Sequence, residues 1–498
     1  MIRTRRAVPV LLAVAAVLLL ATAPAAGAHE STPDGVQRLE ISLGARELGV
    51  AITTPPPGGG AMPVVVVPRG ESPPGTVTVA AVPAGAAAPT APVVLAAGPS
   101  GRPGTAALTA DAAGPWEVLV ADGPAVARIP VTVAATAPTP GWVWVVRAAA
   151  LLGVVGLFVT VAPAVRRRPR APVAAGAAAL VGATVAVSVA LSAPPSAPPT
   201  PEGVVLGPAA APAAAGSDGV GGMGGMAGMA MSSPMSSPMS SPTSGAGMSA
   251  TGAVVLGART EPAAPVAGAP LDLLLDLTDG STGAVVDDLT IHDEALVHLV
   301  VVGPGGQLAH VHPVRTAPGR YAVRVVPAAG GRYGVFAEME RAGEGGHQVA
   351  RTVFDVGGPA PAVASPAPGP GPREAAGLQV DVAVPDAVAG RPTRVALAFS
   401  RGGAPVRDLQ PWLGMGGHLL MLGPGAAGFP DPADPASAFG HVHDMAAAGP
   451  GGRYGPTIGF DYTFPRAGRY QLWAQVQRDG RIVTVPVTLD VAPGTATP

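Results

Sequence analysis

Residues 298–312 read HLVVVGPGGQLAHVH, and a related pattern, HLLML followed by HVH, occupies residues 418–422 and 441–443. In both places a His opens a short apolar run, a Gly/Pro-containing segment follows, and a His-Val-His triplet comes next. Short apolar runs separated by Gly/Pro turns predict antiparallel β-strands. Each stretch therefore predicts a β-hairpin that carries three histidines.

The two hairpins belong to a longer internal repeat. The sequence GRYGVFAE at residues 331–338 matches GRYQLWAQ at residues 468–475. The first two histidines of each copy are 12 residues apart in one and 23 in the other, and the difference falls in a Pro/Asp/Ala-rich loop, as an insertion would. We therefore predict two related β-domains, residues 251–357 (repeat 1) and residues 377–493 (repeat 2), joined by a Pro/Ala/Gly-rich linker at residues 358–376.

The composition excludes several classes of function. The chain has 498 residues with 69 Gly, 60 Pro, no Cys, 4% aromatic residues and a net charge of −2. The absence of Cys rules out disulfides, thiolate zinc sites, iron–sulfur clusters, blue copper and Cys nucleophiles. A net charge this close to zero gives no basic surface for nucleic acid.

Targeting and membrane signals are found in the first half of the chain. Residues 1–28 have an Arg-containing start, an apolar stretch and a small-residue end, which is typical of a cleaved signal peptide. Residues 141–165 and 171–192 are predicted transmembrane helices, separated by an Arg-rich loop at residues 166–170. By the positive-inside rule this loop is cytoplasmic. We therefore expect a two-pass protein of the cell membrane whose N- and C-terminal domains are both extracytoplasmic.

The remaining segments complete the predicted architecture. Residues 29–136 contain short β-type runs between Gly/Pro turns, which favours an N-terminal extracytoplasmic β-domain. Residues 194–250 are a predicted disordered linker that holds seven of the 13 Met residues. The predicted fold class is mainly β: three immunoglobulin-like or cupredoxin-like β-sandwich domains with two transmembrane helices.

The histidine pattern points to metal binding. Residues i and i+2 of a strand project from one face, so each His-Val-His places two imidazoles side by side. His298 joins its triplet if the hairpin loop has an odd number of residues, whereas an even two-residue loop would pair His298 with Val311. The candidate metal ligands are His292, His298, His310, His312, His418, His441, His443, Met415 and Met445.

Copper is the expected metal, and zinc is the alternative. Neutral imidazole suits both ions, while the thioethers of Met415 and Met445 beside the histidines favour copper. The competing interpretation is that the histidines are hydrogen-bonded pairs on a sheet face with no metal.

The HLVVV…HVHP and GRY…WAQ segments resemble extracytoplasmic β-sandwich modules of the YtkA-like or cupredoxin-like kind, which occur in bacterial proteins that handle copper or heavy metals. The resemblance covers about 220 residues of the two repeats, and it implies a sandwich fold and metal handling. Repeat 2 has Trp412 where repeat 1 has His292, and Asp444 where repeat 1 has Pro313. We therefore expect the sites of the two repeats to differ in ligand number.

These observations lead to a functional expectation. The protein is predicted to be a membrane-anchored, extracytoplasmic metal-binding protein that buffers or transfers copper through two His-rich sites and a Met-rich linker. Its expected partners are the metal ion, the lipid bilayer and a copper transporter or chaperone. The alternative is a cell-surface β-sandwich scaffold whose histidines are structural. No Gly-x-Ser-x-Gly elbow is present, and we do not expect an enzyme.

Overall fold

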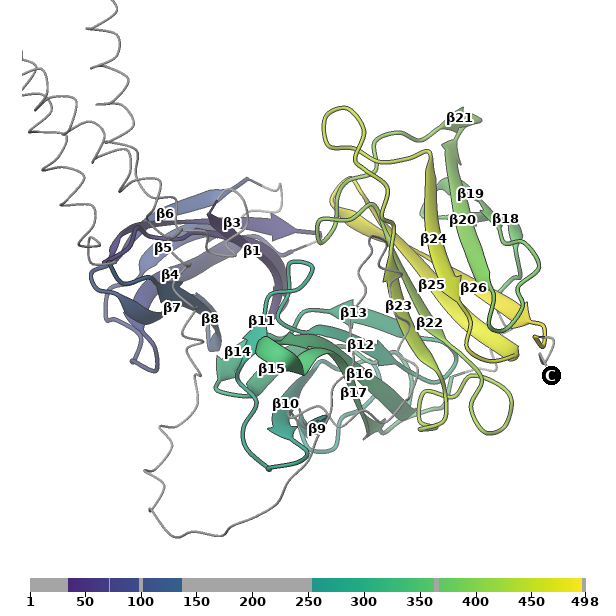
Figure 1. Cartoon of the computed structure of the whole chain (residues 1–498), viewed down its shortest axis with the longest axis horizontal. Helices are drawn as coiled ribbons and strands as arrows, with labels where there is room; N and C mark the ends of the chain where they lie inside the picture. The colour runs from purple at the N-terminus through teal and green to yellow at the C-terminus, as the bar shows by residue number, and fades with distance from the viewer. Residues whose placement is uncertain (1–34, 71, 98–101, 137–252, 362–366, 495–498) are drawn as a thin grey trace, which may run out of the picture.

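The computed structural model describes residues 35–70, 72–97, 102–136, 253–361 and 367–494. These residues form three β-sandwich domains, so the predicted mainly β fold is confirmed (Figure 1). The predicted signal peptide, both predicted membrane spans and the Met-rich linker lie outside the described residues. Within the described part of the chain, no helix is long and apolar enough to cross a membrane.

The N-terminal domain packs one four-stranded sheet, in the order β1-β2-β3-β6, on a second, in the order β5-β4-β7-β8. Its core is formed by the inward-facing residues of both sheets, as the alternating burial along β3 and β6 shows. The strands are β1 (Val36–Leu43), β2 (Arg46–Thr53), β3 (Gly60–Arg69), β4 (Gly75–Pro83), β5 (Val93–Ala97), β6 (Gly104–Ala110), β7 (Gly114–Asp122) and β8 (Ala125–Val133).

Repeat 1 has a four-stranded sheet, β14-β15-β10-β9, and a five-stranded sheet, β11-β16-β12-β13, in which β17 also pairs with β16. Strand β10 reads LDLLLDLTD and buries every second residue, which is the period of a strand with one face on the core. The elements are β9 (Val254–Glu261), β10 (Leu271–Asp279), β11 (Leu289–Thr290), β12 (His298–Val302), β13 (Leu308–Val311), β14 (Val314–Ala317), β15 (Arg320–Val325), β16 (Gly331–Arg341), the short 3₁₀ helix η1 (Gly343–Gly345) and β17 (Gly346–Val356).

Repeat 2 has the same plan, with one sheet in the order β18-β19-β20-β21, to which β24 adds on β20, and the other in the order β23-β22-β25-β26. The strands are β18 (Gly371–Ala375), β19 (Leu378–Ala383), β20 (Pro392–Arg401), β21 (Ala404–Pro405), β22 (His418–Leu422), β23 (Phe439–His443), β24 (Thr457–Thr463), β25 (Gly468–Arg478) and β26 (Arg481–Val491).

Strands β12 and β22 are buried on both faces. One face of each belongs to the core of its own sandwich, and the other face meets the other repeat. An apolar cluster fills this second interface: Val300, Val302 and Phe336 of repeat 1 against Leu420, Leu422 and Trp473 of repeat 2. The Phe336 ring stacks on the Phe439 ring with 4.5 Å between centroids. The two sheets that carry the histidines therefore face each other (Figure 1).

The loop that lengthens repeat 2 contributes to the same interface. Arg351 of β17 donates hydrogen bonds to the carbonyl oxygens of Asp434, Pro435 and Ser437, and its guanidinium lies 5.0 Å from the centroid of the Phe336 ring. The extra residues between the histidines of repeat 2 thus fasten it to repeat 1.

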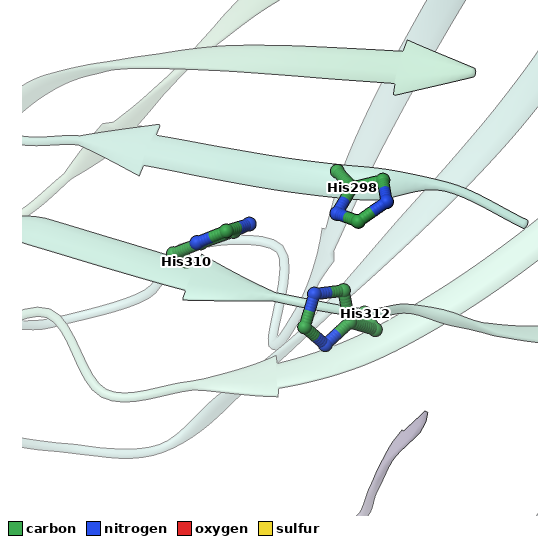
Figure 2. A group of neighbouring side chains, drawn as sticks. All are labelled: His298, His310 and His312. Carbon is green, nitrogen blue, oxygen red and sulfur yellow. The ribbon is translucent and has the colours of Figure 1, made fainter. Parts of the chain in front are cut away.

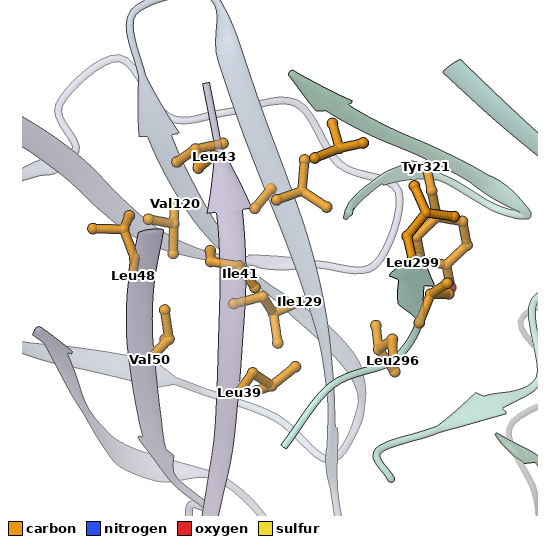
Figure 3. Close-up of a cluster of buried hydrophobic side chains, with 14 of the residues drawn as sticks. Leu39, Ile41, Leu43, Leu48, Val50, Val120, Ile129, Leu296, Leu299 and Tyr321 are labelled. Carbon is orange, nitrogen blue, oxygen red and sulfur yellow. The ribbon is translucent and has the colours of Figure 1, made fainter. Parts of the chain in front are cut away.

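The N-terminal domain shares a continuous apolar core with repeat 1. Leu39, Ile41 and Ile129 belong to the same cluster of buried residues as Leu296 and Leu299, across the domain boundary (Figure 3). Burial of this apolar surface is the main favourable contribution to docking of the two domains.

Candidate metal centre

Two hairpins place histidines on facing surfaces of the two repeats. In repeat 1, Leu299 pairs with Val311 and Val302 with Leu308, so the loop has five residues, the odd number on which the grouping of His298 with its triplet depends. In this register His298 lies across from His312. In repeat 2, His418 pairs directly with His443, and Leu420 with His441.

The three histidines of repeat 1 gather around a common point (Figure 2). The centroids of the His298 ring and the His310 ring are 5.9 Å apart, and the His312 ring lies 5.1 and 5.2 Å from them. One ring nitrogen from each residue lies within 4.8 Å of the other two. This spacing is close enough for three imidazoles to bind one ion after small side-chain movements.

The histidines of repeat 2 lie in the same cluster. Ring nitrogens of His310, His418 and His441 also lie within 4.8 Å of one another. The centroid of the His441 ring is 5.0 Å from that of His310 and 5.6 Å from that of His298. The expected pair of separate His sites, one in each repeat, is therefore wrong: the repeats pack through their His-bearing faces and form one six-histidine cluster.

Main-chain carbonyls fix the outward nitrogens of two rings. Nε2 of His298 donates to the carbonyl oxygen of His292 at 3.0 Å, and Nε2 of His418 donates to that of Trp412 at 3.1 Å. His292 and Trp412 occupy equivalent positions in the two repeats, so the backbone supplies the same contact although the side chains differ. Each contact leaves Nδ1 as the inward, unprotonated nitrogen.

Side chains fix three further rings, each across the repeat interface. Nδ1 of His310 donates to Gln475 Oε1 at 3.1 Å. Nδ1 of His441 lies 2.5 Å from Glu338 Oε2, and Nδ1 of His443 lies 3.2 Å from Asp293 Oδ2. These acceptors orient the rings so that Nε2 points into the cluster, as the outer hydrogen bonds of metal-binding histidines do.

The inward nitrogens have no hydrogen-bond donor. Buried ring nitrogens without a partner among the described residues are Nδ1 of His298 and Nε2 of His310, His312 and His443. The remaining two, His418 Nδ1 and His441 Nε2, lie 3.1 Å apart. Since the outer nitrogens of His418 and His441 carry the protons, two lone pairs face each other at this distance. A cation or an additional proton is needed between them.

Burial keeps most of these imidazoles neutral. Desolvation, reinforced by neighbouring histidines, lowers the pKa of His298 to about 4 and that of His443 to about 3. The same causes hold the pKa values of His310, His312 and His418 well below the ordinary value. Neutral imidazole is the form that binds metal ions.

Two carboxylates supply negative charge beside the cluster. Burial acts to raise the pKa of Glu338, but the contacts with His441 and His347 outweigh it and hold this pKa well below its usual range. Burial likewise opposes ionisation of Asp293, whose pKa is nevertheless lowered by His292 and His443. Both side chains are therefore anions next to clustered imidazoles: Glu338 is hydrogen-bonded to His441, and Asp293 lies 3.2 Å from His443.

The other three predicted ligands lie outside the buried cluster. The His292 side chain is 40% exposed and pairs with Asp293, while only its carbonyl oxygen contacts a clustered ring. Met445 is 68% exposed. Met415 is half-buried in a turn that it forms with Trp412.

Sequence reasoning missed Glu338, Gln475 and Trp412. Glu338 and Gln475 close the repeated GRY motif and stand opposite His298 and His418 in the ladders between strands. Their position across the strand pair from a histidine is the feature that could have marked them as partners of the cluster. The Trp412 ring packs edge-on against His418, with 4.6 Å between centroids, and forms one wall of the cluster.

Comparisons with known proteins give little further information. One family model, a domain of unknown function (DUF8832), matches residues 373–493, which is repeat 2 alone. No curated protein matches the chain.

Several solved β-proteins are similar to this chain. A Salmonella alpha-2-macroglobulin mutant is 14% identical, with 90% of this chain and 22% of that chain covered and a TM-score of 0.17. The Yersinia pseudotuberculosis adhesin InvE is 13% identical, with 47% and 59% covered and a TM-score of 0.14. Fibronectin(III)-like modules of Clostridium thermocellum CbhA are 14% identical, with 49% and 97% covered and a TM-score of 0.14. Scores this low support no conclusion about function.

Proposed function

We propose that the six-histidine cluster binds a first-row transition-metal ion and that the protein is an extracytoplasmic metal-binding protein. One observation carries the proposal: hydrogen bonds fix the outer nitrogens of four rings, while four inner nitrogens, those of His298, His310, His312 and His443, have no hydrogen-bond partner among the described residues. Buried polar atoms without partners are costly and therefore rare. An ion at the centre would satisfy these nitrogens together.

Copper is the favoured ion and zinc the alternative. An imidazole set binds divalent ions in the Irving–Williams order, which peaks at copper. Met445 is exposed, so its thioether does not support the choice of copper. The imidazoles, rather than sulfur, favour copper here. Asp293 and Glu338 offset the charge of a divalent ion through the rings that they contact.

One ion per chain is the expected stoichiometry. His310 belongs to both three-histidine groups, and its Nδ1 is taken by Gln475. Its single free nitrogen can serve one ion at a time, so the two groups describe alternative positions of the same ion.

Metal analysis of the purified full-length protein tests the proposal. After incubation with Cu(II) or Zn(II) and removal of free ion, we expect about one bound ion per wild-type chain. His310→Ala should lose the ion, while Met445→Ala, which removes a side chain that is 68% exposed, should retain it. A wild-type protein without bound metal would reject the proposal.

The wider role follows the expectation from sequence. With the predicted spans as an anchor, the protein would buffer the ion at the extracytoplasmic face of the cell membrane or transfer it to a transporter or chaperone. The alternation of one ion between two groups that share His310 favours transfer, because ligands can be exchanged one at a time.

A cell-surface scaffold is the second candidate. Three β-sandwich domains joined through buried interfaces favour it, since such an array can present a partner-binding surface without any ion. In this case the histidines only join the repeats, and chelators or added metals would leave the melting temperature unchanged.

A further inference from the structure

His312 is held by the N-terminal domain rather than by its own sheet. The ladder between β12 and β13 ends at the pair Leu299 and Val311. The main-chain N–H of His312 instead donates to Ser42 Oγ at 3.0 Å, and its carbonyl oxygen accepts from the N–H of Ser42 at 2.8 Å. Strand β1 thereby forms a parallel bridge, between Ser42 and Pro313.

Repeat 2 shows what this contact replaces. There His443 lies within β23, paired with His418, and the N–H of the next residue, Asp444, donates to the Gly417 carbonyl at 3.0 Å. Repeat 1 has Pro313 in place of Asp444, and proline has no N–H to continue the ladder. The N-terminal domain supplies the missing support.

The same edge of the N-terminal domain contacts a second segment of the centre. The N–H of Glu40 donates to the carbonyl oxygen of Glu294 at 2.7 Å. Glu294 follows Asp293, the carboxylate that contacts His443. Strand β1 thus contacts one backbone segment that carries His312 and another that carries Asp293, the carboxylate beside His443.

The contact is part of a well-buried interface. Arg315 joins Glu117 of the N-terminal domain at 2.8 Å and Asp287 of repeat 1 at 2.7 Å, and all three side chains are 3–4% exposed. Leu39 and Ile41 line the space beside His312, where a cavity of only about 10 Å³ remains. His312 is 3% exposed, so a movement of this domain would shift its backbone and expose its ring.

We infer that the N-terminal domain is a positioning part of the metal centre, acting through Ser42 on His312, so that ion binding and docking of this domain strengthen each other. The inference rests on the proposed metal-binding function. Linkage requires the coupling to be reciprocal: the docked domain raises the affinity for the ion, and the ion raises the stability of the docked state.

Ser42→Ala in the full-length protein tests the inference, with Ser72→Ala as the matched control. Ser72 is a buried serine of the same domain whose hydrogen bonds, among the described residues, are with the main chain of Glu47 and Arg69. Loss of the Ser42 hydroxyl leaves the N–H of His312 without its acceptor, and we expect about tenfold weaker Cu(II) affinity in a competition titration with a chelator. Ser72→Ala should bind as wild type, and Ser42→Thr, which keeps a hydroxyl, should restore affinity.

Hydrogen exchange gives a readout that a purely structural role would not change. Adding Cu(II) to the wild type should slow exchange of the Ser42 amide, and this protection should shrink in Ser42→Ala. Equal Cu(II) affinity of Ser42→Ala and wild type, without protection at Ser42, would overturn the inference and leave the metal-binding function intact. Failure of the wild type itself to bind Cu(II) would remove both.

Discussion

Glu338 of repeat 1 accepts a hydrogen bond from His441 of repeat 2, and the equivalent residue of repeat 2, Gln475, accepts one from His310 of repeat 1. The two contacts are related as the repeats are, so the interface is nearly symmetric. The exception is charge, because one acceptor is a carboxylate and the other an amide. The negative charge of this pair of acceptors therefore lies in repeat 1, as does that of Asp293.

Glu338→Gln should remove one of the two carboxylates beside the centre and weaken ion binding. Substitution of an outer acceptor of a metal-binding histidine typically costs 10–100-fold in affinity, and we expect a loss of about this size. Chelator competition measures it. Glu340→Gln, two residues along the same strand, is the control, and an equal loss in both variants would contradict a specific role for Glu338.

Gly334→Ala should loosen the contact between the repeats. A Cβ at this position would clash with the carbonyl of Pro432 in the long loop of repeat 2. Overpacking of this kind costs about 1–3 kcal/mol. We therefore expect a lower melting temperature together with loss of bound metal. Gly257→Ala is the control, because its Cβ would have no neighbour closer than 3.6 Å.

Arg315→Met should destabilise docking of the N-terminal domain. It leaves the buried Asp287 without its guanidinium partner, and breaking a buried ion pair costs about 3–5 kcal/mol. Arg332→Met breaks an exposed pair with Asp355, whose side chains are 58% and 67% exposed, and should cost at most about 1 kcal/mol. Urea unfolding compares the two, and equal midpoints would refute the prediction.

Glu47 should make the N-terminal domain less stable as pH rises. Burial raises the pKa of Glu47 to about 8 from its ordinary value of 4.5, with the neighbouring Glu40 adding to the shift and the Ser42 hydroxyl opposing it. Between these two pH values the folded domain keeps a proton that the unfolded chain has lost, so stability falls through this window and is level above it.

Glu47→Gln should remove this dependence. The variant should gain melting temperature over wild type at pH 8 and little at pH 4.5. Glu374→Gln, which changes an exposed carboxylate, should leave the pH profile unchanged. A wild-type profile that is flat from pH 4.5 to 8 would contradict the raised pKa.

Local sequence features predicted the strands but left the hairpin register open. The apolar runs after His298 and His418 are strands, as their composition indicates. The sequence did not decide between an odd and an even loop, and the Gly/Pro turn proves to be the odd loop that keeps His298 and His312 together. A shift of one residue in this register would have turned His298 to the other face.

The joining of the repeats was missed because it depends on residues far apart in sequence. The sequences HLVVV and HLLML nevertheless indicated burial on both faces, because they are apolar at every position after the His. A strand with one solvent-exposed face alternates apolar and polar residues instead. Such runs require cover on both faces. The contact between Ser42 and His312 could not be predicted, because no feature of the sequence around Ser42 indicates a partner some 270 residues away.

Docking of the N-terminal domain on repeat 1 also restricts where the two domains can lie relative to a membrane. The hydrogen bonds between Ser42 and His312 require direct contact, and a bilayer between the domains would separate these residues. A reagent that cannot cross a membrane should therefore reach both domains or neither.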